Sequence, residues 1–200
     1  MRKNQDNFLP DCFYHIFSRT NNRERLFKQP KNYQYFLNKY DLYLSGCLDT
    51  YAYCLLRNHI HLLVKVKSEE ELLPQMTNGD FKSVHSLISK QFATLFGTYA
   101  KAINKQEKRY GNLFQRPYKR KQISNESHFS HLVYYIHANP TLHTPNVDFK
   151  KYKWSSYQTM LSNAKTKLAR QEVLDWFGGV EQFVSFHDRQ DPLNLDSTLE

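Results

Sequence analysis

The chain lacks the features of several common classes of protein. Its 200 residues include only three cysteines, none of them in a C-x-x-C pair: Cys12, Cys47 and Cys54. An odd number of cysteines without zinc-ligand spacing excludes a disulfide scaffold and a zinc finger, so we expect reduced thiols in a cytoplasmic protein. No apolar run approaches the roughly 20 residues that cross a bilayer, and no apolar segment follows the polar N-terminus, so a membrane or secreted protein is not expected.

The sequence also lacks the glycine-rich and serine motifs of nucleotide-binding proteins and hydrolases. Only six residues are glycine, and no P-loop, G-x-G-x-x-G or G-x-S-x-G pattern is present. A loop that wraps a phosphate with backbone amides, or a serine nucleophile on a sharp turn, therefore has no support.

Positive charge and aromatic rings are plentiful. Lys and Arg number 28 against 19 Asp and Glu, giving a net charge of +9, and there are 14 Tyr and 14 Phe. An excess of cations favours a polyanionic partner, and without a membrane segment the polyanion expected is nucleic acid. Rings that alternate with cations suit unstacked bases, although most of these rings must belong to the core.

The apolar periodicity predicts seven secondary-structure elements up to Pro140. Strands are expected over 12–19, 49–56, 59–67 and 116–123, and helices over 30–44, after a cap at Asp80, and over 126–138, where Pro140 prevents continuation. The stretch 68–79 is expected to be a loop. This order indicates an α+β fold: a ferredoxin-like (RRM-like) antiparallel sheet with helices on one face, as in many nucleic-acid binders.

The change in sequence character beyond residue 145 indicates the domain organisation. We expect one domain over 1–145, followed over 146–200 by a small helical extension and a polar tail. Two short amphipathic segments, 168–177 and 180–187, supply the helices of this extension. A chain of this length is ample for one core with such an appendage.

Two histidines lie two residues apart in a stretch that otherwise has the pattern of a strand. Successive side chains of a strand point to opposite faces, so His59 and His61 lie on one face and Ile60 on the other. Two neutral imidazoles side by side can bind one divalent metal ion. The alternative is that they are hydrogen-bonded histidines at a strand edge, so the metal site needs a third ligand from elsewhere.

The expected helix over 126–138 offers both a ligand and a nucleophile. Its buried stripe is predicted to consist of Phe129, Leu132, Val133 and Ile136. Tyr135 and Asn139, with His131, then lie along one flank, while Tyr134 and His137 lie towards the other. If that flank faces the histidine strand, Asn139 supplies an oxygen ligand and the Tyr135 phenol lies near the metal. Otherwise Tyr135 only packs between helix and sheet, and Asn139 caps the helix end.

A metal, a tyrosine and a cationic surface together favour phosphoryl transfer at a phosphodiester. The metal can polarise the scissile phosphate, and attack by tyrosine leaves a phosphotyrosine that conserves the ester bond for later rejoining. Mg²⁺ prefers carboxylates and water, so a site of two histidines and one asparagine indicates Mg²⁺ or Mn²⁺ as cofactor.

The chain resembles the single-tyrosine HUH transposases, and in particular the REP-associated tyrosine transposases. The blocks that carry the resemblance are Tyr14-His-Ile-Phe-Ser-Arg19, Asn58-His-Ile-His-Leu-Leu63, Gly111-Asn-Leu-Phe-Gln-Arg116, Tyr135-Ile-His-Ala-Asn-Pro140 and Trp154-Ser-Ser-Tyr157. The resemblance implies that His59 and His61 bind the metal, that Asn139 takes the position of the third ligand, and that Tyr135 is the nucleophile. It also implies cleavage of single-stranded DNA near hairpins, with the 5′ phosphate held on tyrosine and a 3′ hydroxyl set free.

A run of cations interleaved with aromatic residues precedes the tyrosine helix and is expected to contact single-stranded or hairpin DNA. The expected contacts are Lys105, Lys108, Arg109, Arg116, Lys119, Arg120 and Lys121. Tyr110, Phe114 and Tyr118 between them offer stacking surfaces. The alternative is a solvated charged face.

Other functions stay open at this point. One is a non-enzymatic nucleic-acid binder in which the histidines are structural. Another is a replication or conjugation initiator with the same histidine pair; such proteins commonly bring a second tyrosine or a helicase domain, and Tyr134 beside Tyr135 keeps a two-tyrosine version open. The sequence also leaves open whether the tyrosine helix serves its own subunit or the other subunit of a homodimer.

Overall fold

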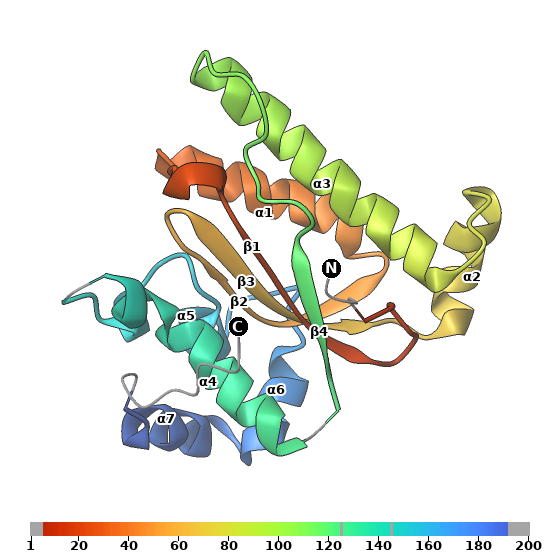
Figure 1. Cartoon of the computed structure of the whole chain (residues 1–200). Coiled ribbons are helices and arrows are strands. Elements are labelled where there is room, and N and C mark those ends of the chain that lie inside the picture. Colours follow the sequence, from red (N-terminus) through yellow and green to blue (C-terminus); the bar gives the residue numbers. More distant parts are fainter. Residues whose placement is uncertain (1–5, 125, 145, 192–200) are drawn as a thin grey trace.

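A computed structural model describes residues 6–124, 126–144 and 146–191, and its sheet has four antiparallel strands (Figure 1). The strands are β1 (Phe13–Arg19), β2 (Leu48–Leu55), β3 (His59–Val66) and β4 (Lys119–Ile123), in the spatial order β2-β3-β1-β4. The helices are α1 (Pro30–Leu44), α2 (Glu69–Asn78), α3 (Val84–Gln106), α4 (Glu126–His143), α5 (Tyr157–Leu161), α6 (Arg170–Phe177) and α7 (Val180–Arg189), with 3-10 turns η1 (Asn21–Arg23) and η2 (Phe149–Lys151). The predicted α+β class is confirmed. The element order up to α4 is β-α-β-β-α-α-β-α, which has one helix more than the predicted β-α-β-β-α-β-α.

The sheet is covered on both faces, because its central strands carry apolar side chains in both directions. Ile60, Leu62 and Val64 of β3 pack in one core with α1 and α3. Leu63, between them, faces a second core built on α4. The expected placement of helices on one face therefore holds for α1 and α3, whereas α4 covers the opposite face (Figure 1).

The C-terminal residues share the second core with α4. Phe149, Tyr157, Val173 and Phe183 are buried there together with Phe129 and Ile136 of α4. The two amphipathic segments form α6 and α7, as expected. Helix α4 is consequently buried on all sides over residues 132–140, between the sheet and the C-terminal helices.

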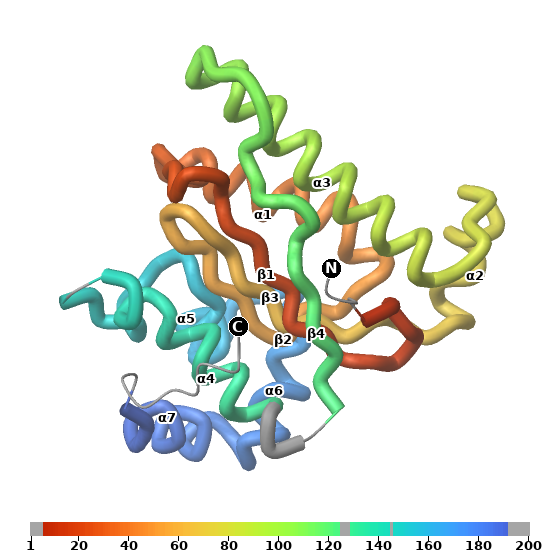
Figure 2. The backbone as a smooth tube through the Cα atoms, in the orientation of Figure 1, coloured from red at the N-terminus to blue at the C-terminus, as the bar shows by residue number. Residues whose placement is uncertain are grey.

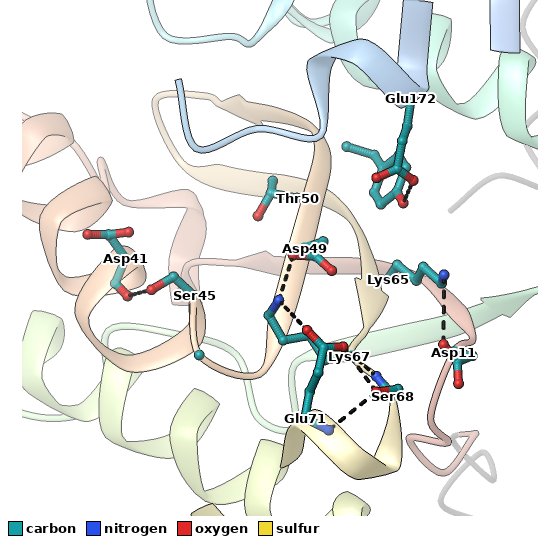
Figure 3. A network of polar contacts seen from close by, with 12 residues as sticks. Asp11, Asp41, Ser45, Asp49, Thr50, Lys65, Lys67, Ser68, Glu71 and Glu172 are labelled. Carbon is teal, nitrogen blue, oxygen red and sulfur yellow. Dashed lines mark hydrogen bonds and ion pairs between the residues drawn. The ribbon is translucent and has the colours of Figure 1, made fainter. Parts of the chain in front are cut away.

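The prediction of a loop over residues 68–79 was wrong, because this stretch forms α2. Ser68 and Glu71 cap its first turn reciprocally through side-chain and backbone hydrogen bonds. Lys67 bridges Asp49 on β2, at 3.0 Å, to Glu71 on α2, at 3.2 Å (Figure 3). The expected cap at Asp80 was also wrong: the Ser83 side chain caps α3, and Asp80 lies before it with a φ of 52°.

The prediction that Pro140 ends the third helix was wrong as well. Helix α4 runs through Pro140 to His143, and Thr144 N–H donates to the Pro140 carbonyl. A proline inside a helix removes one backbone donor and crowds the preceding turn. Burial of α4 on all sides offsets that cost. Local sequence patterns do not reveal this burial, because it depends on helices later in the chain.

The connection from α3 to β4 passes beside η1 on its way to the sheet edge (Figure 2). Asn21 N–H donates to the Leu113 carbonyl, and Gln115 N–H donates to the Arg19 carbonyl. These hydrogen bonds hold residues 113–115, within the predicted basic segment, beside the C-terminal end of β1, where Arg19 lies opposite His59 of β3. Within the described part of the chain, no helix is long and apolar enough to cross a membrane.

Candidate active site

The pairing of β1 with β3 builds a histidine cluster on the face covered by α4. His59 and His61 point to the same face, with ring centroids 5.2 Å apart, and both are buried. In the antiparallel register Arg19 lies opposite His59, and Phe17 lies opposite His61. The strand parity predicted from sequence therefore places the two imidazoles as expected.

A third histidine, His15 on β1, contacts His61 directly. His15 Nε2 and His61 Nδ1 are 2.9 Å apart, so one ring donates a hydrogen bond to the other. Burial, reinforced by the neighbouring His15 and His59, holds the pKa of His61 well below its usual range. His61 is thus a neutral imidazole, and its buried Nε2 has no hydrogen-bond partner among the described residues.

The second imidazole is oriented by its neighbour in sequence. His59 Nδ1–H donates to Asn58 Oδ1 at 2.8 Å, so the other ring nitrogen, Nε2, carries the lone pair. The His143 ring, at the end of α4, stands edge-on to His59 with centroids 4.6 Å apart.

Helix α4 presents Tyr135 to this cluster and turns Tyr134 away. The Tyr135 ring stands edge-on to His61 and to His15, with centroid distances of 5.5 Å and 6.0 Å. Tyr134 Oη donates instead to the Gln190 carbonyl at 3.1 Å, and burial raises the pKa of Tyr134 to about 12. The helix phase predicted for Tyr135 and Tyr134 is therefore the one observed. His131, which was expected on the Tyr135 flank, is instead exposed, with its ring 5.6 Å from that of Phe186 on α7.

Asn139 lies one turn beyond Tyr135 and is fully buried. Its Nδ2 donates to the Tyr135 carbonyl at 2.8 Å, while its Oδ1 has no hydrogen-bond partner among the described residues. An amide oxygen and an imidazole nitrogen, each buried and unpaired, are donors that fit a divalent cation. No group of three or more His, Cys, Asp or Glu side chains in the described chain could hold a metal, and the expected set differs by including an asparagine.

A cavity of about 570 Å³ adjoins His59. Its cationic lining residues are Arg19, Arg23 and Lys119, and its lining includes no Asp or Glu. His59 and His143 form part of its wall, so the histidine cluster borders an electropositive cleft.

The expected DNA-contact residues divide by their environment. Arg116, Lys119 and Lys121 are exposed around β4, and Lys105 and Lys108 are exposed at the end of α3. Two others have partners within the protein. Arg109 pairs with Glu24 at 3.0 Å and with Asn104, and the Arg120 guanidinium lies 5.0 Å from the centre of the Phe8 ring and donates to the Asp6 carbonyl.

Sequence reasoning missed four residues of this region: His15, Arg19, Arg23 and His143. Strand parity could have found the first two, since alternate residues of β1 share a face and β1 was expected to be a strand. Arg23 and His143 carried no such signal, because their positions depend on a turn conformation and on the extension of α4 past Pro140.

Known proteins resemble this chain in fold but not detectably in sequence family. No protein-family model and no curated protein matches the chain. A solved structure of a REP-associated tyrosine transposase bound to a REP hairpin is similar, with a TM-score of 0.58 and 18% identity over 82% of this chain and 87% of that one. The likeness at this identity shows a shared fold.

Proposed function

We propose that the chain is a single-strand-specific DNA endonuclease and strand transferase of the transposase type that acts through Tyr135. The observation that carries the proposal is the contact of the Tyr135 ring with His61 and His15, one helical turn before the unpaired Oδ1 of Asn139. The fold shared with a REP-associated transposase supports the same reading.

His59, His61 and Asn139 would hold the cofactor, Mg²⁺ or Mn²⁺. When bound, such an ion polarises a phosphate and offsets the negative charge that grows on its oxygens. The protein contributes preorganised donors. The hydrogen bond between His15 and His61 and the one from His59 to Asn58 orient both rings before any ligand arrives.

The reaction is an exchange of phosphate esters. The Tyr135 phenol oxygen attacks phosphorus, a Tyr135–phosphate ester forms, and the bond from phosphorus to the 3′ oxygen breaks. The phenol proton passes to solvent and the departing 3′ oxygen takes up a proton, so neither water nor a nucleotide is consumed. Attack by a 3′ hydroxyl on the phosphotyrosine reverses these steps and rejoins a strand.

The proposed partner is a DNA hairpin with unpaired flanks, since the cations around β4 and at the end of α3 are exposed. The protein of similar fold is bound to a REP hairpin. Exposed bases allow aromatic stacking, so hairpins with unpaired flanks are expected to compete better than blunt duplex.

The test compares the adjacent tyrosines. Labelled hairpin oligonucleotides from the DNA that flanks its own gene are incubated with the protein and Mg²⁺ or Mn²⁺, and covalent adducts are mapped by mass spectrometry. Tyr135→Phe removes one oxygen and is expected to abolish the adduct, whereas Tyr134→Phe, the matched control, is expected to retain it. A nucleotide found on Tyr134 refutes the assignment, and binding without any adduct favours a non-enzymatic nucleic-acid binder.

A further inference from the structure

The turn η1, between β1 and α1, has a strained backbone. Asn22 and Arg23 are consecutive residues with a φ of 54° each. The left-handed region is unfavourable for a residue other than glycine, and asparagine tolerates it better than arginine does. Such strain persists only where neighbouring contacts impose it, and it concentrates at functional sites.

The contacts that impose this conformation come from both sides of the turn. Asn21 N–H donates to the Leu113 carbonyl, and Asn21 Nδ2 donates to the carbonyls of Asn112 and Phe114 at 3.1 Å and 3.3 Å. Thr20 Oγ1 lies 2.6 Å from the Glu24 carbonyl oxygen, to which it donates. None of these bonds uses the Arg23 side chain, so the turn fixes the backbone and leaves the guanidinium available.

Arg23 is exposed and lines the cleft beside His59. Within the described residues its guanidinium has neither a hydrogen bond nor an ion pair, and the adjacent carboxylate, Glu24, is already paired with Arg109. An unpaired arginine on a cleft wall that includes Lys119 and no acidic side chain is suited to a phosphate.

The cleft offers amide donors as well as charge, whereas the Phe17 ring in its wall is buried. Lys119 Nζ lies 5.3 Å from the centre of the Phe17 ring, and both residues line the cleft together with the amides of Asn58 and Gln115. Charge and amide donors in one groove match a single strand, which exposes phosphates and base edges together.

We infer that this cleft binds the unpaired DNA strand next to the cleaved phosphate, with Arg23 and Lys119 on its backbone phosphates. The inference rests on the proposed function, because His59 belongs both to the cleft lining and to the proposed metal site. Arg23 binds the strand, and the strained backbone of η1 holds the Arg23 side chain at the cleft.

Binding is measured in a Tyr135→Phe background, in which no adduct is expected, by fluorescence anisotropy across a salt series. Arg23→Ala is expected to weaken binding of a hairpin with unpaired flanks several-fold and to reduce the slope of log K against log salt by about 0.7, one single-strand phosphate contact. Binding of the same hairpin without flanks should not change. Arg189→Ala, on α7, removes the same charge away from η1 and is the matched control.

A second variant separates charge from strain. Arg23→Gly relieves the left-handed backbone, so it is expected to raise the Tm above that of Arg23→Ala while binding the flanked hairpin as weakly. Arg23→Lys keeps a charge and should restore part of the salt dependence. If Arg23→Ala and Arg23→Gly both bind the flanked hairpin like the parent, the inference is overturned.

Failure of the inference and failure of the proposed function give different results. If the parent never forms an adduct but Arg23→Ala weakens binding of the unpaired flank, the cleft binds the strand and the proposed cleavage reaction is wrong. An adduct in the parent with unaltered binding in Arg23→Ala overturns the cleft alone. Inorganic phosphate is titrated separately: if it saturates an Arg23-dependent site and the DNA flank adds no affinity, the cleft is a free-anion site and the inference fails.

Discussion

The two nitrogens of the His61 ring have different surroundings. Nδ1 shares a hydrogen bond with His15, whereas Nε2 is buried with no partner among the described residues. A buried polar atom without a partner costs about 1–3 kcal/mol, so a native site that keeps one commonly has a use for it. At this scale the arrangement favours a ligand atom over a purely structural histidine.

His59→Ala and His61→Ala are each expected to abolish cleavage while sparing most of the DNA binding, because the rings would hold a metal rather than the polymer. Nicking and hairpin binding are measured on the same oligonucleotide. His131→Ala, at an exposed histidine of α4, is the control. Nicking at the parental rate by either ligand variant would end the metal-site interpretation.

Asn139→Ala is expected to raise the metal concentration needed for half-maximal nicking without abolishing the reaction, since water can replace one neutral oxygen ligand. The variant also loses the bond from Nδ2 to the Tyr135 carbonyl, so its Tm is measured in parallel. Asn139→Asp retains an oxygen at this position and should keep the metal dependence. A metal titration that is identical in the parent and Asn139→Ala would remove Asn139 from the site.

At the scale of elements, the phase of α4 and the end of α3 decide which residues can act. One turn of α4 separates Tyr135, against the histidines, from Asn139, and the same phase sends Tyr134 to the Gln190 carbonyl. At the end of α3 the cations divide into exposed lysines and an arginine held by Glu24. The two kinds of cation should respond differently to substitution.

Lys105→Ala and Lys108→Ala are each expected to weaken hairpin binding and to lower the salt slope by about 0.7 if they contact single-stranded phosphates. Arg109→Ala is expected mainly to reduce the free energy of unfolding, because it removes the partner of Glu24 and Asn104. Anisotropy across a salt series and urea denaturation measure the two effects. Unchanged salt slopes in both lysine variants would show that this face is only solvated.

At the scale of the whole molecule, a buried chain of hydrogen bonds ties the sheet to the C-terminal helices. Ser156 Oγ lies 2.9 Å from the backbone nitrogen of Tyr53 and 2.7 Å from His137 Nε2. His137 Nδ1 lies 3.0 Å from His187 Nε2, and His187 Nδ1–H donates to the Phe183 carbonyl. The chain links β2, α4 and α7 through two imidazoles that have no access to solvent.

Burial lowers the pKa of His187 to about 4 and holds that of His137 well below its usual range. A histidine whose pKa is depressed by folding binds fewer protons in the native state, so its contribution is present above the unfolded value of about 6.5 and is lost as the pH falls towards 4. We expect the free energy of unfolding to drop between pH 7 and pH 4, with His187 accounting for about 3 kcal/mol.

Urea denaturation at pH 7 and pH 4 tests this expectation. His187→Gln should lose stability at pH 7 but show a smaller difference between the two pH values than the parent does. His131→Gln, at an exposed histidine, should keep the parental difference. If the free energy of unfolding falls equally between the two pH values in the parent and in His187→Gln, the His137–His187 pair does not govern acid stability.

Sequence alone determined the features of this protein that follow from the side-chain periodicity of a strand or a helix. A period of two placed His59 and His61 on one face, and a period of 3.6 placed Tyr135 with Asn139 and turned Tyr134 away, because backbone geometry fixes these directions locally. The helices α6 and α7 and the four strands of the sheet were predicted from the same patterns.

Tertiary structure decided everything that depends on which segments meet. The bond between His15 and His61 requires the register of β1 with β3, and the passage of α4 through Pro140 requires burial by the C-terminal helices. The presentation of Arg23 requires contacts with residues some 90 positions later in the chain. Long-range contacts of this kind leave no periodic trace in the sequence, because they depend on packing free energy summed over the whole molecule.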